Sequence, residues 1–186
     1  MTPEEQFDAA AASALRDRED LVRFLEGVSE AGARFQPPGG EWSIAEGAEH
    51  ILLTEPWVRE FMGEALRKAG ESGEWDTAPD KPVKMTYEAL RRREQGRVEA
   101  PAHLLPRGGR GFAEMRDSLL PDRRASLDLL LPHRSRNLSR LVIPSASYGD
   151  LHFYDRIHYL GIHDYLHREQ MERVLRAPGF PAAGPP

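Results

Sequence analysis

Two histidines, His163 and His167, lie four residues apart in the stretch Gly161–Gln170, whose residue pattern is helical. On a helix, positions i and i+4 lie on one face and one turn apart, so both imidazoles can approach the same point. Two imidazoles that converge in this way are suited to hold a metal ion. The same spacing also occurs in pairs of neighbouring surface histidines, and the rest of the chain has to distinguish the two interpretations.

The helix that carries this pair is expected to turn both histidines toward the protein core. At about 100° per residue, they fall within an arc of roughly 80° that is otherwise apolar. Because a buried, unpaired polar group costs about 1–3 kcal/mol, each imidazole needs a partner there. A shared metal ion would satisfy both, and so would separate carboxylates, carbonyls or waters. The other members of the stripe are Phe153, Leu160, Met171 and Val174.

A third ligand has to come from another helix, because a catalytic metal site commonly has three protein ligands and one open position. His50 is the best candidate, since it lies on an apolar stripe early in a second predicted helix. A capping box of Ser43 and Glu46 marks the start of that helix. The alternative is a surface histidine beside Glu46 and Glu49. The sequence thus offers three histidines from two helices as candidate ligands.

The composition excludes several classes of site. The chain of 186 residues contains no cysteine, which rules out disulfides, cysteine-ligated zinc and thiolate nucleophiles. Its net charge of −5 argues against nucleic acid as a partner, which requires a basic surface. No apolar stretch has the length of a membrane span, and no cationic, apolar leader opens the chain. We therefore expect a cytoplasmic protein with no membrane partner.

Four long helices are predicted from apolar residues at three- and four-residue steps, and no strand pattern competes with them. They cover residues 4–31, 43–70, 112–131 and 150–176, the last with Asp150 as its N-cap. Between the second and third helices, residues 71–111 form a long irregular crossover with one short helix over Thr86–Gln95. The expected fold is all-α, with one four-helix-bundle domain over residues 1–176 and a disordered Pro/Ala/Gly tail over residues 177–186.

The order of these motifs resembles the DinB/YfiT-like superfamily. Trp42-Ser-Ile-Ala-Glu-Gly-Ala-Glu-His50 opens the second helix, Tyr148-Gly-Asp-Leu precedes the fourth, and His163-x-x-x-His167-x-x-Gln170 lies within it. Members carry a tryptophan, a Ser or Thr cap and a histidine early in helix two, and an H-x-x-x-H pair in helix four. The resemblance covers about residues 4–176. The crossover, rich in arginine and proline, departs from the family pattern, so no substrate contact is carried over to it.

The resemblance implies an up-down-down-up bundle, a homodimer, a small-molecule substrate and an open triad that binds a divalent metal such as zinc or nickel. The implied ligands are His50, His163 and His167. Three further polar residues are candidates to hydrogen-bond these ligands, the alternative being that all three are solvated. They are Glu46, Asp164 and Gln170.

An open site of three histidines can polarise a carbonyl, or lower the pKa of a bound water or thiol toward neutrality. The resemblance points to transferases and isomerases that use low-molecular-weight thiols, and also to metal-dependent hydrolases. The leading hypothesis is a metal-dependent transferase that activates a low-molecular-weight thiol for attack on an electrophile. The alternatives are a metal-dependent hydrolase and a non-catalytic metal-binding or stress-response bundle, so the sequence leaves open whether the chain is an enzyme.

Overall fold

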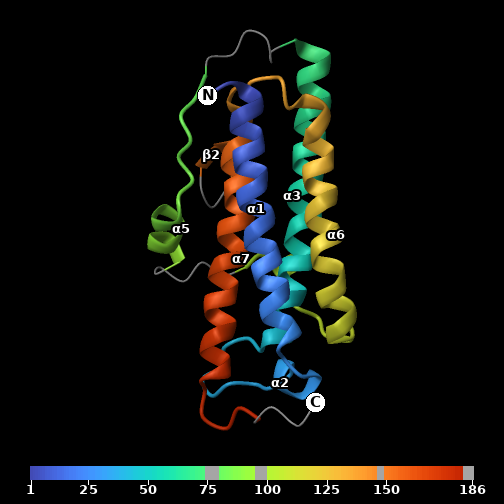
Figure 1. The fold of residues 1–186 in the computed structure, drawn as a ribbon, viewed down its shortest axis with the longest axis vertical. Helices are drawn as coiled ribbons and strands as arrows, with labels where there is room; N and C mark the ends of the chain where they lie inside the picture. The colour runs from blue at the N-terminus through green and yellow to red at the C-terminus, as the bar shows by residue number, and fades with distance from the viewer. Residues whose placement is uncertain (74–79, 95–99, 146–148, 182–186) are drawn as a thin grey trace.

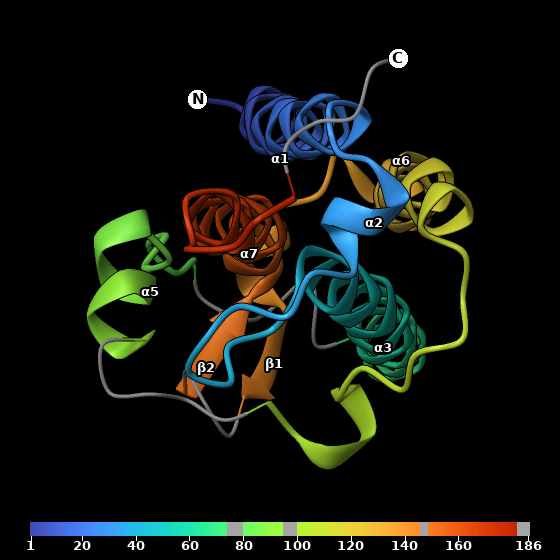
Figure 2. The same cartoon turned by 90° about the horizontal axis from the view of Figure 1, so that it is seen from below.

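The computed structural model describes residues 1–73, 80–94, 100–145 and 149–181, apart from the side chains of residues 91–94 and 144–145. Four long helices pack side by side, with α1 and α3 each in contact with both α6 and α7 (Figures 1 and 2). Their bounds are α1 Pro3–Glu26, α3 Ile44–Ser72, α6 Phe112–Leu130 and α7 Phe153–Leu175. The prediction of an all-α protein is confirmed. Within the described residues, no helix combines the length and the hydropathy that crossing a bilayer requires.

The long crossover follows from the directions of the helices. In Figure 1, α1 and α7 run from top to bottom, whereas α3 and α6 both run from bottom to top. Because α3 and α6 are parallel, the chain has to travel the length of the bundle between them. On the way it forms α5 (Tyr87–Glu94), the expected short helix, and the 3₁₀ turn η1 (Ala102–Leu104). The Asp155 carboxylate of α7 anchors this segment by accepting the backbone N–H groups of Lys84 (2.7 Å) and Met85 (2.8 Å).

The start of α3 confirms the predicted capping box. The Ser43 hydroxyl accepts the backbone N–H of Glu46 (3.2 Å), and the Glu46 carboxylate accepts the backbone N–H of Ser43 (2.7 Å). Two amides that have no partner within the helix are thereby satisfied, which fixes where α3 begins. This matters for function because His50 lies in the second turn of the same helix.

The predicted start of α7 was wrong, as was the expectation that no strand would form. Strands β1 (Val142–Ser145) and β2 (Gly149–His152) pair as an antiparallel hairpin, which holds Asp150 in extended conformation. The helix begins only after the hairpin ends. Its N-cap is His152, whose Nδ1 accepts the backbone N–H of Asp155 at 3.2 Å.

The end of the first helix and the C-terminal segment also differ from the sequence prediction. The first helix stops at Glu26, and a separate short helix, α2 (Glu30–Ala33), is capped by Ser29. In the segment expected to be a disordered tail, the Phe180 ring packs edge-on against Phe35, with centroids 5.5 Å apart. That part of the tail therefore covers the end of the bundle, while residues 182–186 lie outside the described part.

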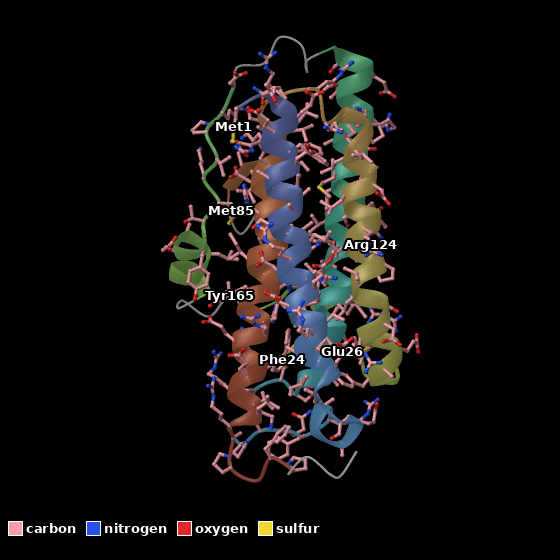
Figure 3. The ribbon with its side chains drawn as sticks, in the orientation of Figure 1. Met1, Phe24, Glu26, Met85, Arg124 and Tyr165 are labelled. Carbon is pink, nitrogen blue, oxygen red and sulfur yellow. The ribbon has the colours of Figure 1, made fainter. Side chains whose placement is uncertain are left out.

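The core consists of two apolar clusters with a polar layer between them, and side chains from all four long helices fill it (Figure 3). The first cluster includes Ala14, Val58, Leu130 and Leu160. The second includes Leu21, Ile51, Leu119 and Met171. Between these two sets lie Arg18 on α1, Glu55 on α3, Arg123 on α6 and residues 163–167 on α7, and His50 lies beside Ile51, just over one turn before Glu55. The site described below belongs to this layer.

Gly161 allows α1 and α7 to approach closely beside the polar layer. A Cβ atom at this position would lie 3.1 Å from Ala14 Cα and 2.5 Å from the Asp17 carboxylate. The Asp17 side chain could move aside, but Ala14 Cα belongs to the backbone of α1 and could not. The glycine at the start of the histidine stretch is thus required by helix packing.

Candidate metal centre

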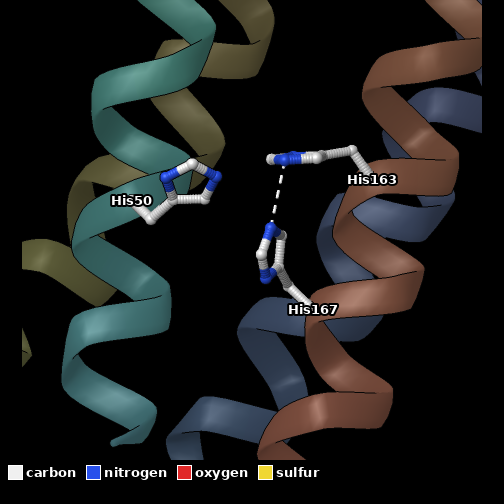
Figure 4. Close-up of side chains that lie close together, drawn as sticks. All are labelled: His50, His163 and His167. Atoms are coloured by element: carbon white, nitrogen blue, oxygen red, sulfur yellow. Dashed lines mark hydrogen bonds between the residues drawn. The ribbon is translucent and has the colours of Figure 1, made fainter. Parts of the chain in front are cut away.

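The structure brings His50, His163 and His167 together, and these three residues are called the histidine triad below. One ring nitrogen of each lies within 4.8 Å of one ring nitrogen of the other two. Figure 4 shows the His50 imidazole of α3 facing the two imidazoles of α7 across the gap between the helices. Each of the three side chains is 6% exposed, so the alternative of surface histidines does not hold. Among the described residues, this is the group with the residue types and spacing to hold a metal ion.

Hydrogen bonds at two of the imidazoles determine which nitrogen is available to a ligand. His50 Nδ1 lies 2.8 Å from the backbone oxygen of Leu104, and His167 Nδ1 lies 2.8 Å from Gln170 Oε1. Because a carbonyl oxygen only accepts, Nδ1 carries the proton in both rings. The Nε2 atoms of His50 and His167 therefore present lone pairs, as metal ligands must.

The third imidazole completes the convergence. His163 Nε2 lies 3.0 Å from His167 Nε2. Two nitrogens that share a tetrahedral ion at about 2.0–2.1 Å are roughly 3.3 Å apart, so a small adjustment adapts this pair to an ion. Without an ion, His163 Nε2 has to donate a proton to its neighbour, because two lone pairs at this distance repel. The donor set therefore fits a divalent metal of the zinc or nickel class.

All three imidazoles are neutral at pH 7, which is the form that binds metal. Burial lowers the pKa of His50 below its ordinary value of 6.5, and the Leu104 carbonyl only partly opposes this. Burial, followed by the neighbouring imidazoles of His167 and His50, holds the pKa of His163 well below 6.5. Burial and His50 lower the pKa of His167 to about 3. At pH 7 a metal ion would therefore meet little competition from protons.

Aromatic rings form the walls around the triad. The Trp42 ring lies 4.9 Å from the His50 ring and, nearly parallel, 6.3 Å from the His167 ring. Tyr159 stacks on His163 with centroids 5.2 Å apart. These contacts help to orient the imidazoles.

The three polar residues expected near the ligands have different places. Gln170 does contact the triad, through the bond to His167 Nδ1. The Glu46 carboxylate instead accepts the backbone N–H of Ser43 and the side-chain amide of Gln36. Asp164 is neither solvated nor bound to an imidazole in any described hydrogen bond: it is completely buried, in a cluster of charged residues.

This cluster, the arginine–carboxylate quartet, was not predicted from the sequence. Each long helix contributes one residue, and the four are Arg18, Glu55, Arg123 and Asp164. A signal was nevertheless present, because Arg18 occupies an apolar position of the first helix, four residues after Ala14 and three before Leu21. A charge on such a stripe indicates a buried ion pair, but not its partner.

Leu104 was also missed as a part of the site. It acts through its backbone oxygen, which every residue type possesses, so its side chain gives no signal. Glu49 of α3 holds the crossover in place for this contact. Its carboxylate accepts the backbone N–H groups of Arg107 (3.2 Å) and Gly108 (2.9 Å).

Comparison with protein families agrees with the motif resemblance. A family model described as the DinB superfamily matches residues 14–171, a range that contains the whole triad. Tyr148, part of one motif that suggested the family, lies outside the described residues. Searches among curated proteins and among solved structures gave no match. Because the family model covers most of the sequence, the chain belongs to the DinB superfamily.

Proposed function

We propose that this protein is a metal-dependent transferase in which His50, His163 and His167 hold a divalent ion, zinc or nickel, that activates a low-molecular-weight thiol. The observation that carries the proposal is the convergence of three buried, neutral imidazoles, two of which have their lone pairs fixed by hydrogen bonds at the opposite nitrogen. Membership in the DinB superfamily supports the same assignment.

The charge balance of the site favours an anionic ligand. All three donors are neutral, and the nearest buried carboxylate in sequence, Asp164, is already paired with Arg18 and Arg123. No carboxylate in the described part of the chain joins the triad. A bound divalent ion would keep its charge and would lower the pKa of a coordinated thiol. The protein has no cysteine, so the sulfur has to come from a small molecule.

The residues around the triad then have defined tasks. Leu104 and Gln170 orient His50 and His167, while Trp42 and Tyr159 pack against the imidazole rings. The thiol would lose its proton to a water molecule, and its sulfur would form a bond to the electrophilic centre of a second small molecule, whose leaving group would depart with the electrons of the broken bond. The helix directions in Figure 1 support the up-down-down-up bundle that the family implies. The homodimer stays a prediction, which light scattering on the purified protein tests.

Metal content tests the first half of the proposal. Protein purified without a histidine tag should contain about one zinc or nickel ion per chain, and His50→Ala or His167→Ala should lose it. Glu172→Ala is a matched control, because Glu172 is a half-exposed residue of α7 that pairs with Arg168. Absence of metal at neutral pH, even after metal is added back, would overturn the proposal.

Thiol consumption tests the second half. The metal-loaded protein is incubated with a panel of electrophiles and several cellular thiols, and the triple-alanine variant of the triad is the blank. Turnover above the blank supports the transferase. Ester or amide cleavage without thiol would favour the hydrolase, and bound metal without any turnover would favour a non-catalytic metal-binding protein.

A further inference from the structure

A hydroxyl group that the proposed ligand set does not use lies beside the triad. Thr54 is one turn after His50 on α3, and its side chain is 2% exposed. Its Oγ1 is 2.8 Å from the backbone oxygen of His50 and 3.4 Å from His50 Nε2. Thr54 thus places a polar oxygen next to the nitrogen that would bind metal.

The proton of this hydroxyl is directed away from the triad. The shorter distance, 2.8 Å, identifies the backbone oxygen of His50 as its acceptor. Consequently Oγ1 and His50 Nε2 face each other with lone pairs at 3.4 Å, since His50 carries its proton on Nδ1. Two buried acceptors at this distance need a cation or a hydrogen-bond donor between or beside them.

The bond to the His50 carbonyl can be given up at small cost. Both residues lie inside α3, where the backbone N–H of Thr54 already donates to the same carbonyl. A threonine hydroxyl that bonds back to the i−4 carbonyl adds little to helix stability. Rotation about one C–O bond therefore frees the proton without leaving any buried group unpaired.

We propose that the Thr54 hydroxyl would donate a hydrogen bond to an anionic thiol sulfur bound at the histidine triad and so strengthen thiol binding. A thiol bound to the ion would give its proton to a water molecule, which would leave the sulfur as an anion. The Thr54 proton would turn from the His50 carbonyl to that sulfur. Thr54 is a thiol-binding residue in this arrangement, and the inference rests on the proposed metal site and thiol.

The test is a thiol titration of the cobalt(II)-loaded protein, because cobalt(II) replaces zinc and reports thiolate binding through a charge-transfer absorption band. The probe is 2-mercaptoethanol. Thr54→Val preserves the shape of the side chain and removes the hydroxyl, and Thr54→Ser restores it. Ser139→Ala is the control, since Ser139 is an equally buried hydroxyl that binds the backbone N–H of Lys81, away from the triad.

Thr54→Val should weaken thiol binding about tenfold or more, the ratio expected for one hydrogen bond to a charged atom. Cobalt affinity, measured by chelator competition, should change less than about threefold, a small part of that effect. Thr54→Ser and Ser139→Ala should bind thiol as the wild type does.

Three results would overturn the inference and separate it from the proposed function. Equal thiol affinity in wild type and Thr54→Val rejects the role of Thr54 and leaves the metal site and thiol intact. A parallel loss of cobalt and thiol affinity in Thr54→Val shows that Thr54 supports the fold instead. Wild-type protein that binds cobalt but no thiol rejects the thiol and Thr54 together, while the metal site stands.

Discussion

Two polar clusters occupy the same layer of the core and meet on α7, where His163 belongs to one and Asp164 to the other. The triad consists of three neutral rings from two helices. The quartet consists of two cations and two anions from four helices, each at most 1% exposed. Both are buried polar groups in an apolar core, yet the partners they find are different.

The quartet satisfies itself. Arg18 binds both carboxylates, Asp164 at 2.8 and 3.0 Å and Glu55 through Nη2. Arg123 does the same, at 3.0 Å to Asp164 and 2.7 Å to Glu55. Three further guanidinium N–H groups donate to backbone oxygens of neighbouring helices. These belong to Ala14, Leu119 and Leu160.

The triad, in contrast, directs ring nitrogens from two helices toward one point. Its outer nitrogens are bound by Leu104 and Gln170, but its inner nitrogens face one another. The comparison teaches how to separate a structural cluster from a ligand site at equal burial. A closed set of donors and acceptors holds helices together, whereas ring nitrogens that converge on one point can accept a cation from outside.

Breaking the quartet should have the largest effect on the fold. Asp164→Ala leaves Arg18 and Arg123 partly unpaired in the core, so the free energy of unfolding should fall by about 3–5 kcal/mol. Denaturant unfolding measures this. The control is Arg23→Ala, which removes an exposed ion pair with Asp20 and should cost less than about 1 kcal/mol. A loss below that limit for Asp164→Ala would contradict a closed, stabilising quartet.

The sequence predicts much of this layer but not its partition into two clusters. The helical periodicity of the last helix places His163 and His167 on its apolar face. The capping box at Ser43 fixes where the second helix begins and therefore which face carries His50. Both depend on spacing along one helix. The fold class is predictable for the same reason, since four amphipathic stretches can bury their apolar faces only against one another.

What the sequence does not predict depends on contacts between distant segments. The role of Asp164 follows from arginines on two other helices, and the bond to His50 comes from a backbone carbonyl of the crossover. The hairpin before α7 is four residues per strand, too short for a periodic pattern to appear. Its pairing nevertheless displaced the predicted cap from Asp150 to His152.

Acid should weaken the metal-free protein through the triad. Each folded-state pKa lies below 6.5, the ordinary value, so below pH 6.5 the unfolded chain binds protons that the folded chain does not. Stability should therefore fall as the pH drops from 7 to 5, by roughly 1 kcal/mol per pH unit for each histidine at most. Denaturant unfolding at several pH values, with a chelator present, measures the slope.

Glu55 of the quartet does not titrate between pH 7 and 5. Burial alone would raise the pKa of Glu55, but Arg18 and Arg123 hold that pKa below its ordinary value of 4.5. Its contribution to stability is complete above that value and is lost only at lower pH. The triple-alanine variant of the triad should show a flatter profile between pH 7 and 5. An unchanged slope in that variant would mean that the triad is not the acid-sensitive cluster.

Metal should stabilise the fold only when the triad is intact. An ion that binds the folded chain alone adds about 2.7 kcal/mol at a concentration one hundred times its Kd. Thermal unfolding with and without zinc should show this gain in the wild type and in Arg23→Ala. His167→Ala should show none of it. Equal stabilisation of His167→Ala would place the ion elsewhere and reject the triad as its site.

The smallest expected effect concerns the residue that orients one ligand. Gln170 Oε1 accepts a hydrogen bond from His167 Nδ1–H at 2.8 Å and so leaves Nε2 to bind an ion. Removing this partner in Gln170→Ala should lower zinc affinity by about 10-fold, the low end of such outer hydrogen bonds. Gln170→Glu keeps the acceptor and adds charge, which makes the imidazole a stronger donor, so its affinity should equal or exceed that of the wild type. Chelator competition measures all three proteins. If Gln170→Glu bound zinc as weakly as Gln170→Ala, packing of the amide and not its acceptor oxygen would be what holds His167 in place.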